Sequence, residues 1–255
     1  AEFLAEQVRR NTALGSAVTV GHGWDDSLWS RPPALTDLPD DHPIYLSRVD
    51  VHSALINQAL IRLCPGIEFM EGWNPTGVVS QAAHGLARTT ALDLLTAEDK
   101  QRAQTAFVRK ALSLGIVSVD EMSGPVVASV DDALNLKAAA GEDLEVFVWW
   151  GELFGTATAR EIGAYGAGGD LFVDGSIGSK TALLHEPYSD GGTGVEYISF
   201  HDALRHINMS IESGLPTGFH AIGDAATEIV TRAFNAAVDT WGLGQLIAGK
   251  HRIEH

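Results

Sequence analysis

Between residues 96 and 255, short apolar runs alternate with longer segments of helical periodicity. The predicted strands lie at 116–122, 144–150, 170–175, 216–223 and 251–255. The predicted helices lie at 96–115, 125–141, 156–165, 199–214 and 224–242. Strands that are apolar almost throughout and separated by helices are typical of a parallel sheet that is covered on both faces. This alternation predicts an α/β fold.

The first 95 residues are less regular. Apolar runs at 16–24 and 44–51 indicate strands, and the periodic segment 52–63 indicates a helix that ends at Cys64-Pro65-Gly66. The stretch 64–95 is predicted to be a long irregular loop, and long loops often cover functional sites. By contrast, 96–115 is the clearest helix of the chain, because Thr96 can cap it and Gly115 can end it.

Charge and cysteine content limit the partners and the compartment. The chain has 33 acidic and 17 basic residues and a net charge of −16. Nucleic acids and anionic membranes attract basic surfaces, so we expect neither as a partner. The most apolar stretch, LEVFVWWGELFG, is too short to span a bilayer. A single cysteine, Cys64, allows no intrachain disulfide, which fits a reducing compartment and predicts a cytoplasmic location.

Polar residues lie at or just beyond the carboxyl ends of several predicted strands. They are Asp120, Glu121, Asp174, His220, Asp224 and His255. Both (β/α) barrels and doubly wound sheets carry their chemistry at this end of the strands. The positions therefore predict a site at one edge of the sheet without choosing between these two folds.

His220 and His255 are the strongest candidates for a metal site. They are 255 − 220 = 35 residues apart, which suits one βαβ step of about 30 residues or more. Neighbouring parallel strands would direct both imidazoles to one edge, and zinc prefers nitrogen ligands in a fixed geometry. Two unrelated polar residues at strand ends remain the alternative.

Several longer blocks resemble the amidohydrolase superfamily. FHAIGDAA, RIEH and FVDGSIGSKTALLHEPYSD carry the resemblance, and GHGWDDSLW and YLSRVDVHSALINQAL extend it toward the N-terminus. The blocks look most like the amidohydrolase family 3 branch, which includes N-substituted formamide deformylases and many uncharacterised metal-dependent hydrolases. The resemblance spans nearly the whole chain, in the order of the family.

The resemblance implies a (β/α)₈ TIM barrel with one or two divalent metal ions, with zinc expected. It implies a metal-activated water that hydrolyses a carbon–nitrogen bond of an amide or cyclic amide, a small-molecule substrate. His220 matches the ligand after the fifth barrel strand, and His255 matches the ligand after the sixth. His251 is a weaker candidate, because it begins its strand.

This chain departs from the family pattern at three places. It has no His-x-His pair after a first barrel strand, and the general-base Asp of the family is expected beyond residue 255. Many members carry a lysine, often carboxylated, where this chain has Asp170, so Asp170 is the predicted third ligand. Lys180 lies beyond the strand and is a poor substitute.

These departures lead us to expect an internal fragment, with barrel strands 2–6 and without the flanking β-sandwich. In this interpretation 1–255 is the central part of a barrel domain. Residues 1–95 form an inserted cover region and 96–255 form regular β/α units. A homodimer could protect the open edges of such a partial barrel.

Five residues are predicted to contact substrate: His52, Asp174, Ser176, Lys180 and Asp224. His52 could instead be a solvent-facing residue at a helix start, and the turn that carries Ser176 and Lys180 could simply be tight. Five other histidines are predicted to lie on the surface or in loops: His42, His84, His185, His201 and His206.

Two rival functions remain. The chain could be a catalytically incomplete, metal-free fragment of such an enzyme. It could also be an α/β domain that binds a small molecule without a metal, its histidines being incidental. The missing His-x-His pair favours the first rival for this chain, and the number of matching blocks disfavours the second.

Overall fold

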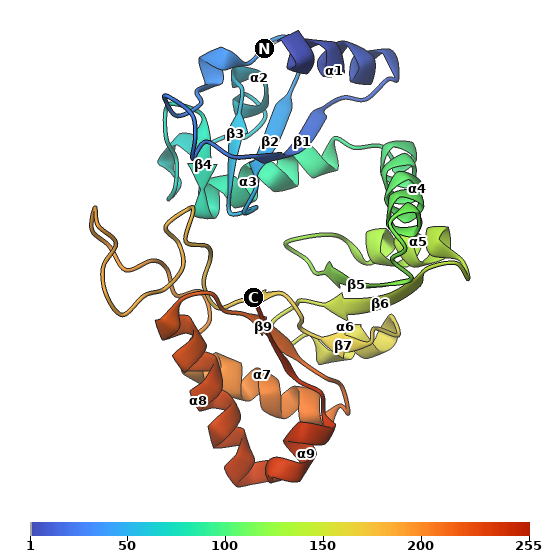
Figure 1. Ribbon diagram of the computed structural model, residues 1–255, viewed down its shortest axis with the longest axis vertical. Coiled ribbons are helices and arrows are strands. Elements are labelled where there is room, and N and C mark those ends of the chain that lie inside the picture. The colour runs from blue at the N-terminus through green and yellow to red at the C-terminus, as the bar shows by residue number, and fades with distance from the viewer. Residues whose placement is uncertain (1) are drawn as a thin grey trace. The chain divides into compact units, whose positions relative to one another are not determined.

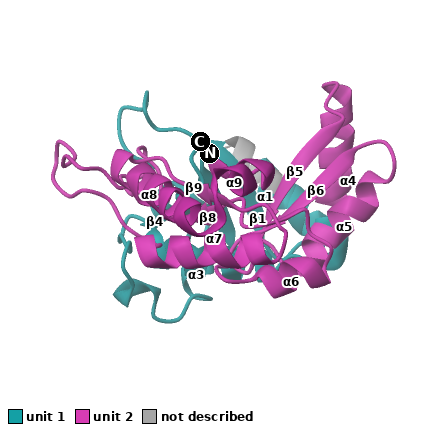
Figure 2. Ribbon diagram, turned by 90° about the horizontal axis from the view of Figure 1, so that it is seen from below, with its two compact units in different colours: residues 1–100 teal, residues 101–255 magenta. Residues whose placement is uncertain are grey.

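The chain folds into two compact units, which span residues 1–100 and 101–255 (Figure 2). The structure, a computed structural model, describes residues 2–255. We call the two parts the N-terminal unit and the C-terminal unit. Among the described residues, no helix combines the length and the apolarity needed to cross a bilayer.

A four-stranded sheet organises the N-terminal unit (Figure 1). Its strands, in spatial order, are β1 (Thr19–Trp24), β2 (Ile44–Arg48), β3 (Ser53–Ile56) and β4 (Val78–Ser80). Strands β1 and β2 are parallel, whereas β2–β3 and β3–β4 are antiparallel. The helices are α1 (Glu2–Ala13), η1 (Leu35–Asp37), α2 (Gln58–Ile61), η2 (Ile67–Phe69) and α3 (Gln81–Asp93). Helix α3 packs its buried alanines on one face of this sheet.

The predicted helix at 52–63 is wrong over its first half. All four residues of β3 are buried, and the strand pairs with neighbours on both sides. The helical turn α2 begins only after Asn57, whose side chain accepts a hydrogen bond from the Leu60 N–H. A short apolar run cannot be assigned to strand or helix by periodicity alone, and here the pairing partners decide.

The predicted irregular loop at 64–95 is also wrong, because it contains β4 and the helix α3. The buried face of α3 consists largely of Ala83, Ala87 and Ala91, at spacings of one turn. Alanine is also common on exposed helix faces, so such a face gives little contrast in hydrophobicity. The periodic signal of α3 was therefore weak although the helix is well packed.

The C-terminal unit contains two three-stranded parallel sheets. Their spatial orders are β5 (Ser118–Ser123), β6 (Glu145–Trp150) and β7 (Gly166–Ala167), and β10 (Arg252–Glu254), β9 (Gly218–His220) and β8 (Leu171–Phe172). The helices are α4 (Ala97–Ser113), α5 (Val130–Ala140), α6 (Thr156–Glu161), α7 (Phe200–Glu212), α8 (Asp224–Trp241) and α9 (Leu243–Ala248). The predicted alternation of strands and helices is confirmed for most of this part, but β7 was not predicted, β8 follows it without a helix, and α9 follows α8 without a strand.

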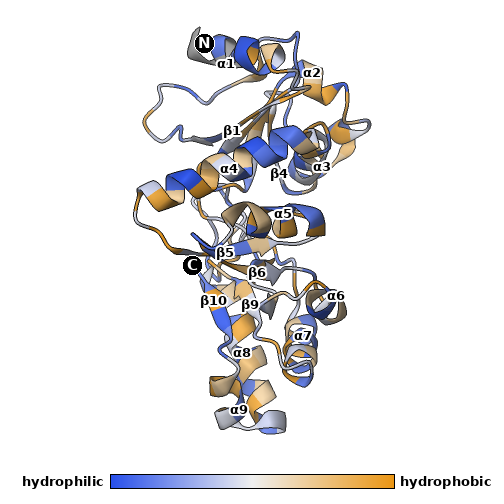
Figure 3. Ribbon diagram, turned by 90° about the vertical axis from the view of Figure 1, so that its right-hand side faces the viewer, coloured by the Kyte–Doolittle hydropathy of each residue, from blue (hydrophilic) through white to orange (hydrophobic). Residues whose placement is uncertain are grey.

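Helix α4 confirms the prediction made for 96–115. The Thr96 hydroxyl accepts a hydrogen bond from the Asp99 N–H at 3.1 Å, and Gly115 adopts a left-handed φ of 77° just beyond the helix. Hydrophilic and hydrophobic residues alternate in bands along α4 (Figure 3). Capping residues and periodicity are local signals, which is why they predicted this helix well.

The segment between β7 and β8 joins the two parallel sheets. The Gly168 N–H donates to the Trp150 carbonyl of β6 at 2.8 Å, and the Gly169 N–H donates to the Gly218 carbonyl of β9 at 3.0 Å. Both glycines have positive φ, 125° and 88°. A Cβ on Gly168 would lie 2.6 Å from the Thr217 hydroxyl oxygen, so neither the conformation nor the space suits a side chain there.

Alternate residues of these strands face opposite sides. Val146, Val148 and Trp150 of β6 pack with residues of α4 and α5 in one core cluster. Phe219 of β9 packs with residues of α7 and α8 in another. Because the side-chain period of a strand is two, His220 points away from the α7–α8 layer that Phe219 contacts. The helices thus cover one face, and the polar residues described next share the other.

Candidate metal centre

His220 and His255 come from neighbouring parallel strands. His220 is the last residue of β9, and Glu254, the last residue of β10, is its partner in the register. His255 follows directly, and the two imidazole centroids lie 4.5 Å apart at an interplanar angle of 69°. The expected proximity of the two rings is therefore observed. His220 is buried, whereas His255 is exposed.

Asp170 completes a group of three potential ligands. It precedes β8, and its Oδ1 lies 3.3 Å from Nδ1 of His220. One ligand atom from each of Asp170, His220 and His255 lies within 4.8 Å of the others. Two ligands bound to zinc at about 2.1 Å in tetrahedral geometry are about 3.4 Å apart. The Asp170–His220 distance fits this value, and two nitrogens with one carboxylate form a donor set that suits zinc.

The His220 ring is oriented by a backbone carbonyl. Its Nε2 lies 3.0 Å from the Gly175 carbonyl oxygen, and this contact assigns the proton to Nε2 and turns Nδ1 toward Asp170. Histidines that bind metals commonly donate their second N–H in this way. Burial acts to lower the pKa of His220, but the contacts with Asp170 and the Gly175 carbonyl and the charges of Asp170 and Asp174 raise it above its ordinary value.

Asp174 holds the segments around this ring. Its carboxylate is fully buried and accepts hydrogen bonds from the backbone N–H groups of Leu183, Ile222 and Gly223 at 2.7, 3.0 and 2.7 Å. These bonds tie the turn after β8 to the loop after β9. The geometry gives Asp174 a positioning role, and its contact with substrate stays a prediction.

The other predicted substrate residues are dispersed. Ser176 is buried, and its hydroxyl accepts from the Ser179 N–H at 3.3 Å. Lys180 is exposed and forms an ion pair with Asp190. Asp224 begins α8 and accepts from the His185 N–H at 3.0 Å. The structure does not bring these side chains into the group formed by Asp170, His220 and His255.

His52 belongs to the N-terminal unit. Its backbone N–H donates to the Asp50 carboxylate at 3.3 Å, in the turn before β3. The suggested position at a helix start is wrong, because a strand follows. Its contact with substrate stays a prediction. His251, the weaker ligand candidate, accepts a hydrogen bond from the Thr217 N–H through Nδ1 at 3.1 Å, at the opposite end of β10 from His255.

Two histidines that we predicted to lie on the surface or in loops are instead buried in helices, His84 in α3 and His206 in α7. His206 accepts from the Phe154 N–H through Nδ1 at 2.9 Å, and its Nε2 lies 3.1 Å from the Ala167 carbonyl. His84 lies 2.7 Å from the Tyr45 hydroxyl through Nε2. Burial lowers the pKa of both rings, that of His84 to about 3. Both act as satisfied core residues rather than surface groups.

A polar cluster that the sequence did not suggest joins β5, β6 and β10, the strand that leads to His255. Asp120 of β5 accepts from Trp149 Nε1 at 2.8 Å and from Arg252 at 3.0 Å. The Arg252 guanidinium lies 4.4 Å from the centroid of the Trp149 ring and 3.6 Å from Glu254. The alternation of Arg252, Ile253 and Glu254 was the available signal, because residues two apart in a strand share a face.

Comparison with known proteins identifies the family. The family model described as "Amidohydrolase family" matches residues 2–255. Protein LONG AFTER FAR-RED 3 of Arabidopsis thaliana is 24% identical, over 96% of this chain and 47% of that protein. The candidate amidohydrolase YtcJ of Bacillus subtilis is 28% identical, over 84% of this chain and 45% of that protein.

Solved structures of two archaeal proteins show a similar fold. An uncharacterized metal-dependent hydrolase from Pyrococcus furiosus has 28% identity and a TM-score of 0.65, over 99% of this chain and 54% of that one. One from Pyrococcus horikoshii OT3 has 24% identity and a TM-score of 0.67, over 98% and 56%.

The chain spans about half the length of the relatives that it matches. The match to the family model nevertheless extends from residue 2 to residue 255, without a region that falls outside it. This chain is a member of the Amidohydrolase family.

Proposed function

We propose that Asp170, His220 and His255 are ligands of a divalent metal ion in a hydrolase that acts on carbon–nitrogen bonds of amides or cyclic amides. One observation carries the proposal: three side chains with metal-binding chemistry converge within 4.8 Å in a chain that matches the Amidohydrolase family over its length. The names of the two archaeal structures, metal-dependent hydrolases, agree with this class of reaction.

Each of the three side chains would supply one ligand atom to the metal ion. A bound divalent ion would supply Lewis acidity for activating water and polarising an amide carbonyl. His220 offers Nδ1, fixed by its bond to the Gly175 carbonyl, and Asp170 offers Oδ1 at 3.3 Å. His255 offers a nitrogen at the exposed side of the group. Zinc usually takes three protein ligands in catalytic sites and leaves one position for water.

Further parts of the proposal concern the whole protein. The six parallel strands of the C-terminal unit are proposed to belong to an incomplete TIM barrel, roughly its strands 2–6, and the N-terminal residues to be an inserted cover region. Zinc is the proposed metal, with a small-molecule amide as substrate and a general-base Asp outside these 255 residues. A cytoplasmic location and a homodimer belong to the same proposal. The contacts of the Gly168–Gly169 segment with both parallel sheets support the barrel.

Zinc binding by the purified chain tests the proposal. Equilibrium dialysis with Zn²⁺, followed by elemental analysis, is expected to give about one saturable equivalent. His220→Ala and Asp170→Asn are each expected to weaken binding at least about tenfold, in line with the loss of one ligand among three. His201→Ala is the matched control, because His201 is exposed on α7 and its loss should leave zinc binding unchanged.

Two results would contradict the metal site. A folded chain that binds no saturable zinc would favour the metal-free fragment. Equal losses of zinc affinity in His220→Ala and His201→Ala would mean that the histidines are incidental. Hydrolysis is tested separately on the full-length protein, because the proposed general-base Asp lies outside these 255 residues, and the release of amine from a panel of linear and cyclic amides is measured. Zinc binding by the full-length protein without turnover of any amide would keep the metal site and exclude this substrate class.

A further inference from the structure

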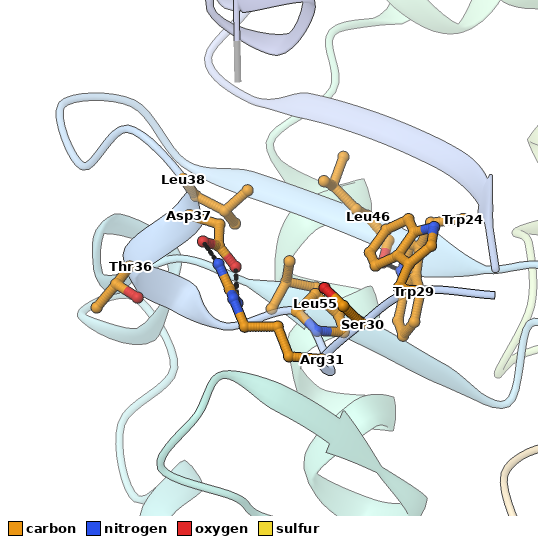
Figure 4. Close-up of a pocket in the computed structure, with 10 residues that line it drawn as sticks. Trp24, Trp29, Ser30, Arg31, Thr36, Asp37, Leu38, Leu46 and Leu55 are labelled. Carbon is orange, nitrogen blue, oxygen red and sulfur yellow. Dashed lines mark hydrogen bonds and ion pairs between the residues drawn. The ribbon is translucent and has the colours of Figure 1, made fainter. Parts of the chain in front are cut away.

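The N-terminal unit contains a cavity of about 640 Å³ (Figure 4). It lies between the loop 25–43 and one face of the sheet. Leu46 of β2 and Leu55 of β3, which are partners in the register, form part of its floor. The opposite face of this sheet carries the core cluster that packs on α3. The loop, which includes η1, therefore lies over the face opposite to the one on which α3 packs.

A glycine in β1 and a β-bulge at the end of that strand shape the floor and one wall of the cavity. A Cβ on Gly21 would lie 2.7 Å from Cδ2 of Leu46, so the glycine leaves room for that leucine. The register between β1 and β2 shifts between His22 and Trp24, and the intervening Gly23 has a φ of 93°. Such bulges redirect the side chain that follows them, and here Trp24 lines the cavity.

Two indole rings form the aromatic wall. The centroids of Trp24 and Trp29 lie 6.1 Å apart, with the ring planes inclined by 31°. Trp24 Nε1 already donates to the Leu46 carbonyl at 2.7 Å, so its polar atom is satisfied within the protein. Trp29 remains 51% exposed although it is a large apolar side chain.

The loop over the cavity is held in place by its own contacts. Arg31 donates to both carboxylate oxygens of Asp37, at 2.9 and 2.5 Å, as the dashed lines of Figure 4 show. Asp37 also accepts from the Ala34 N–H, and the Leu35 N–H donates to the Thr76 carbonyl. The two lining charges neutralise each other. The cavity thus combines the apolar surfaces of the tryptophans and leucines with several polar groups, and it offers no net charge to an ionic ligand.

We propose that this cavity, which is lined by residues of the N-terminal unit, binds an uncharged aromatic ring carried by a small organic molecule. Its volume lies within the range of about 300–1,000 Å³ that is typical of small-molecule sites. Indole faces prefer offset or edge contacts with another ring, which selects an aromatic group over an aliphatic one. The leucines supply the remaining apolar surface.

Ligand-observed saturation-transfer NMR tests the proposal, with benzyl alcohol as the aromatic probe and cyclohexylmethanol as the aliphatic one of similar size. The chain is first treated with a chelator, so that no metal site can bind the hydroxyl group. Saturable transfer to benzyl alcohol is expected, with a dissociation constant lower than that of cyclohexylmethanol by about threefold or more, which is the preference expected of aromatic contacts.

Three variants locate the site. Trp29→Ala is expected to weaken benzyl alcohol binding about three- to tenfold, and Trp29→Phe to retain most of it. Leu28→Ala is the matched control, because Leu28 is 95% exposed in the same loop and is not among the residues that line the cavity. Circular dichroism confirms that each variant is folded.

Four outcomes would overturn the proposal. They are no saturable binding of benzyl alcohol, equal binding of the two probes, equal losses in Leu28→Ala and Trp29→Ala, and binding that appears only after zinc is added. The last outcome would assign the probe to the metal centre. Because the measurement uses chelated protein, failure of the metal proposal leaves this test unaffected.

Discussion

Asp120 and Arg252 are 132 positions apart in the sequence, and Nη1 of Arg252 donates to Oδ2 of Asp120 at 3.0 Å. The pair links β5 and β10, which are the outermost strands of their respective sheets. The indole of Trp149 completes the contact, because it donates to the other oxygen of Asp120 and lies under the guanidinium. Strand β10, which leads to His255, is thus attached both to β9 and to β5.

Replacing Arg252 tests this attachment. Arg252→Met is expected to lower the free energy of unfolding by about 1 kcal/mol, since a partly exposed ion pair and one cation–π contact are each worth about 0.5–1 kcal/mol. It is also expected to weaken zinc binding several-fold, because β10 orients His255. Urea titration and equilibrium dialysis measure the two effects. Arg9→Met, which removes an exposed pair in α1, should change neither; equal effects would argue against a specific role for Arg252.

Replacing Asp174 should destabilise the fold, because its buried carboxylate accepts three backbone hydrogen bonds. Asp174→Asn replaces an oxygen that accepts backbone N–H groups with an NH₂ group, which leaves buried donors facing one another. A loss of about 1–3 kcal/mol in unfolding free energy is expected, measured by urea titration. Asp190→Asn is the control, because Asp190 is 56% exposed and contacts Lys180. A difference of less than about 0.5 kcal/mol between the two variants would contradict the positioning role.

Histidine burial predicts a loss of stability in mild acid. The pKa of His84 is lowered to about 3 by burial and by the charges of Arg88 and His52, whereas the unfolded chain titrates near 6.5. As the pH falls below about 6.5, the His84 side chain becomes protonated in the unfolded state but stays neutral in the folded state. The free energy of unfolding therefore falls by at most about 1.4 kcal/mol per pH unit. The loss continues until the folded pKa is reached.

The variant His84→Gln isolates this contribution. Glutamine can still bond to the Tyr45 hydroxyl but does not titrate. The drop in unfolding free energy between pH 7.5 and pH 5.5 is expected to be smaller in the variant than in the parent, by about 1 kcal/mol. His185→Gln, at an exposed position, is the control. Identical pH slopes in all three proteins would show that His84 takes up its proton while folded.

Gly223 has no room for a side chain. Its φ of −67° suits any residue, but a Cβ would lie 1.8 Å from the Leu183 carbonyl oxygen. Gly223→Ala is therefore expected to cost about 1–3 kcal/mol, and thermal unfolding measures it. Gly244→Ala in α9, where nothing lies within 4 Å, should be neutral or slightly stabilising. Tolerance of Gly223→Ala would mean that the segment at Leu183 can move.

Signals that lie within a few residues of one another, such as helix caps, predicted their elements correctly. The helix after Thr96 has a capping residue, acidic residues in its first turn and a terminating glycine, all within a few positions. The β9–β10 pair followed from the spacing of His220 and His255. By contrast, β3 was predicted as part of a helix, because its strand pairing depends on residues outside the segment.

The candidate site was predicted only in part, for physical reasons that differ from residue to residue. Asp170 was proposed from family resemblance, since nothing local distinguishes it from a surface aspartate. His206 could have been found, because it lies on the buried side of α7 with Ala203, Ile207 and Ser210, at helical spacing. The Asp120–Arg252 pair could not, because contacts between distant strands depend on the finished fold.

The two glycines between β7 and β8 have a consequence for the candidate centre. One short stretch of backbone is bonded to β6 and to β9, and Asp170 is the next residue along it. Any change in the angle at which one parallel sheet continues into the other must therefore alter the distance from Asp170 to His220. A measurement of metal affinity in solution would then report on the curvature between the two sheets, and it would need no substrate.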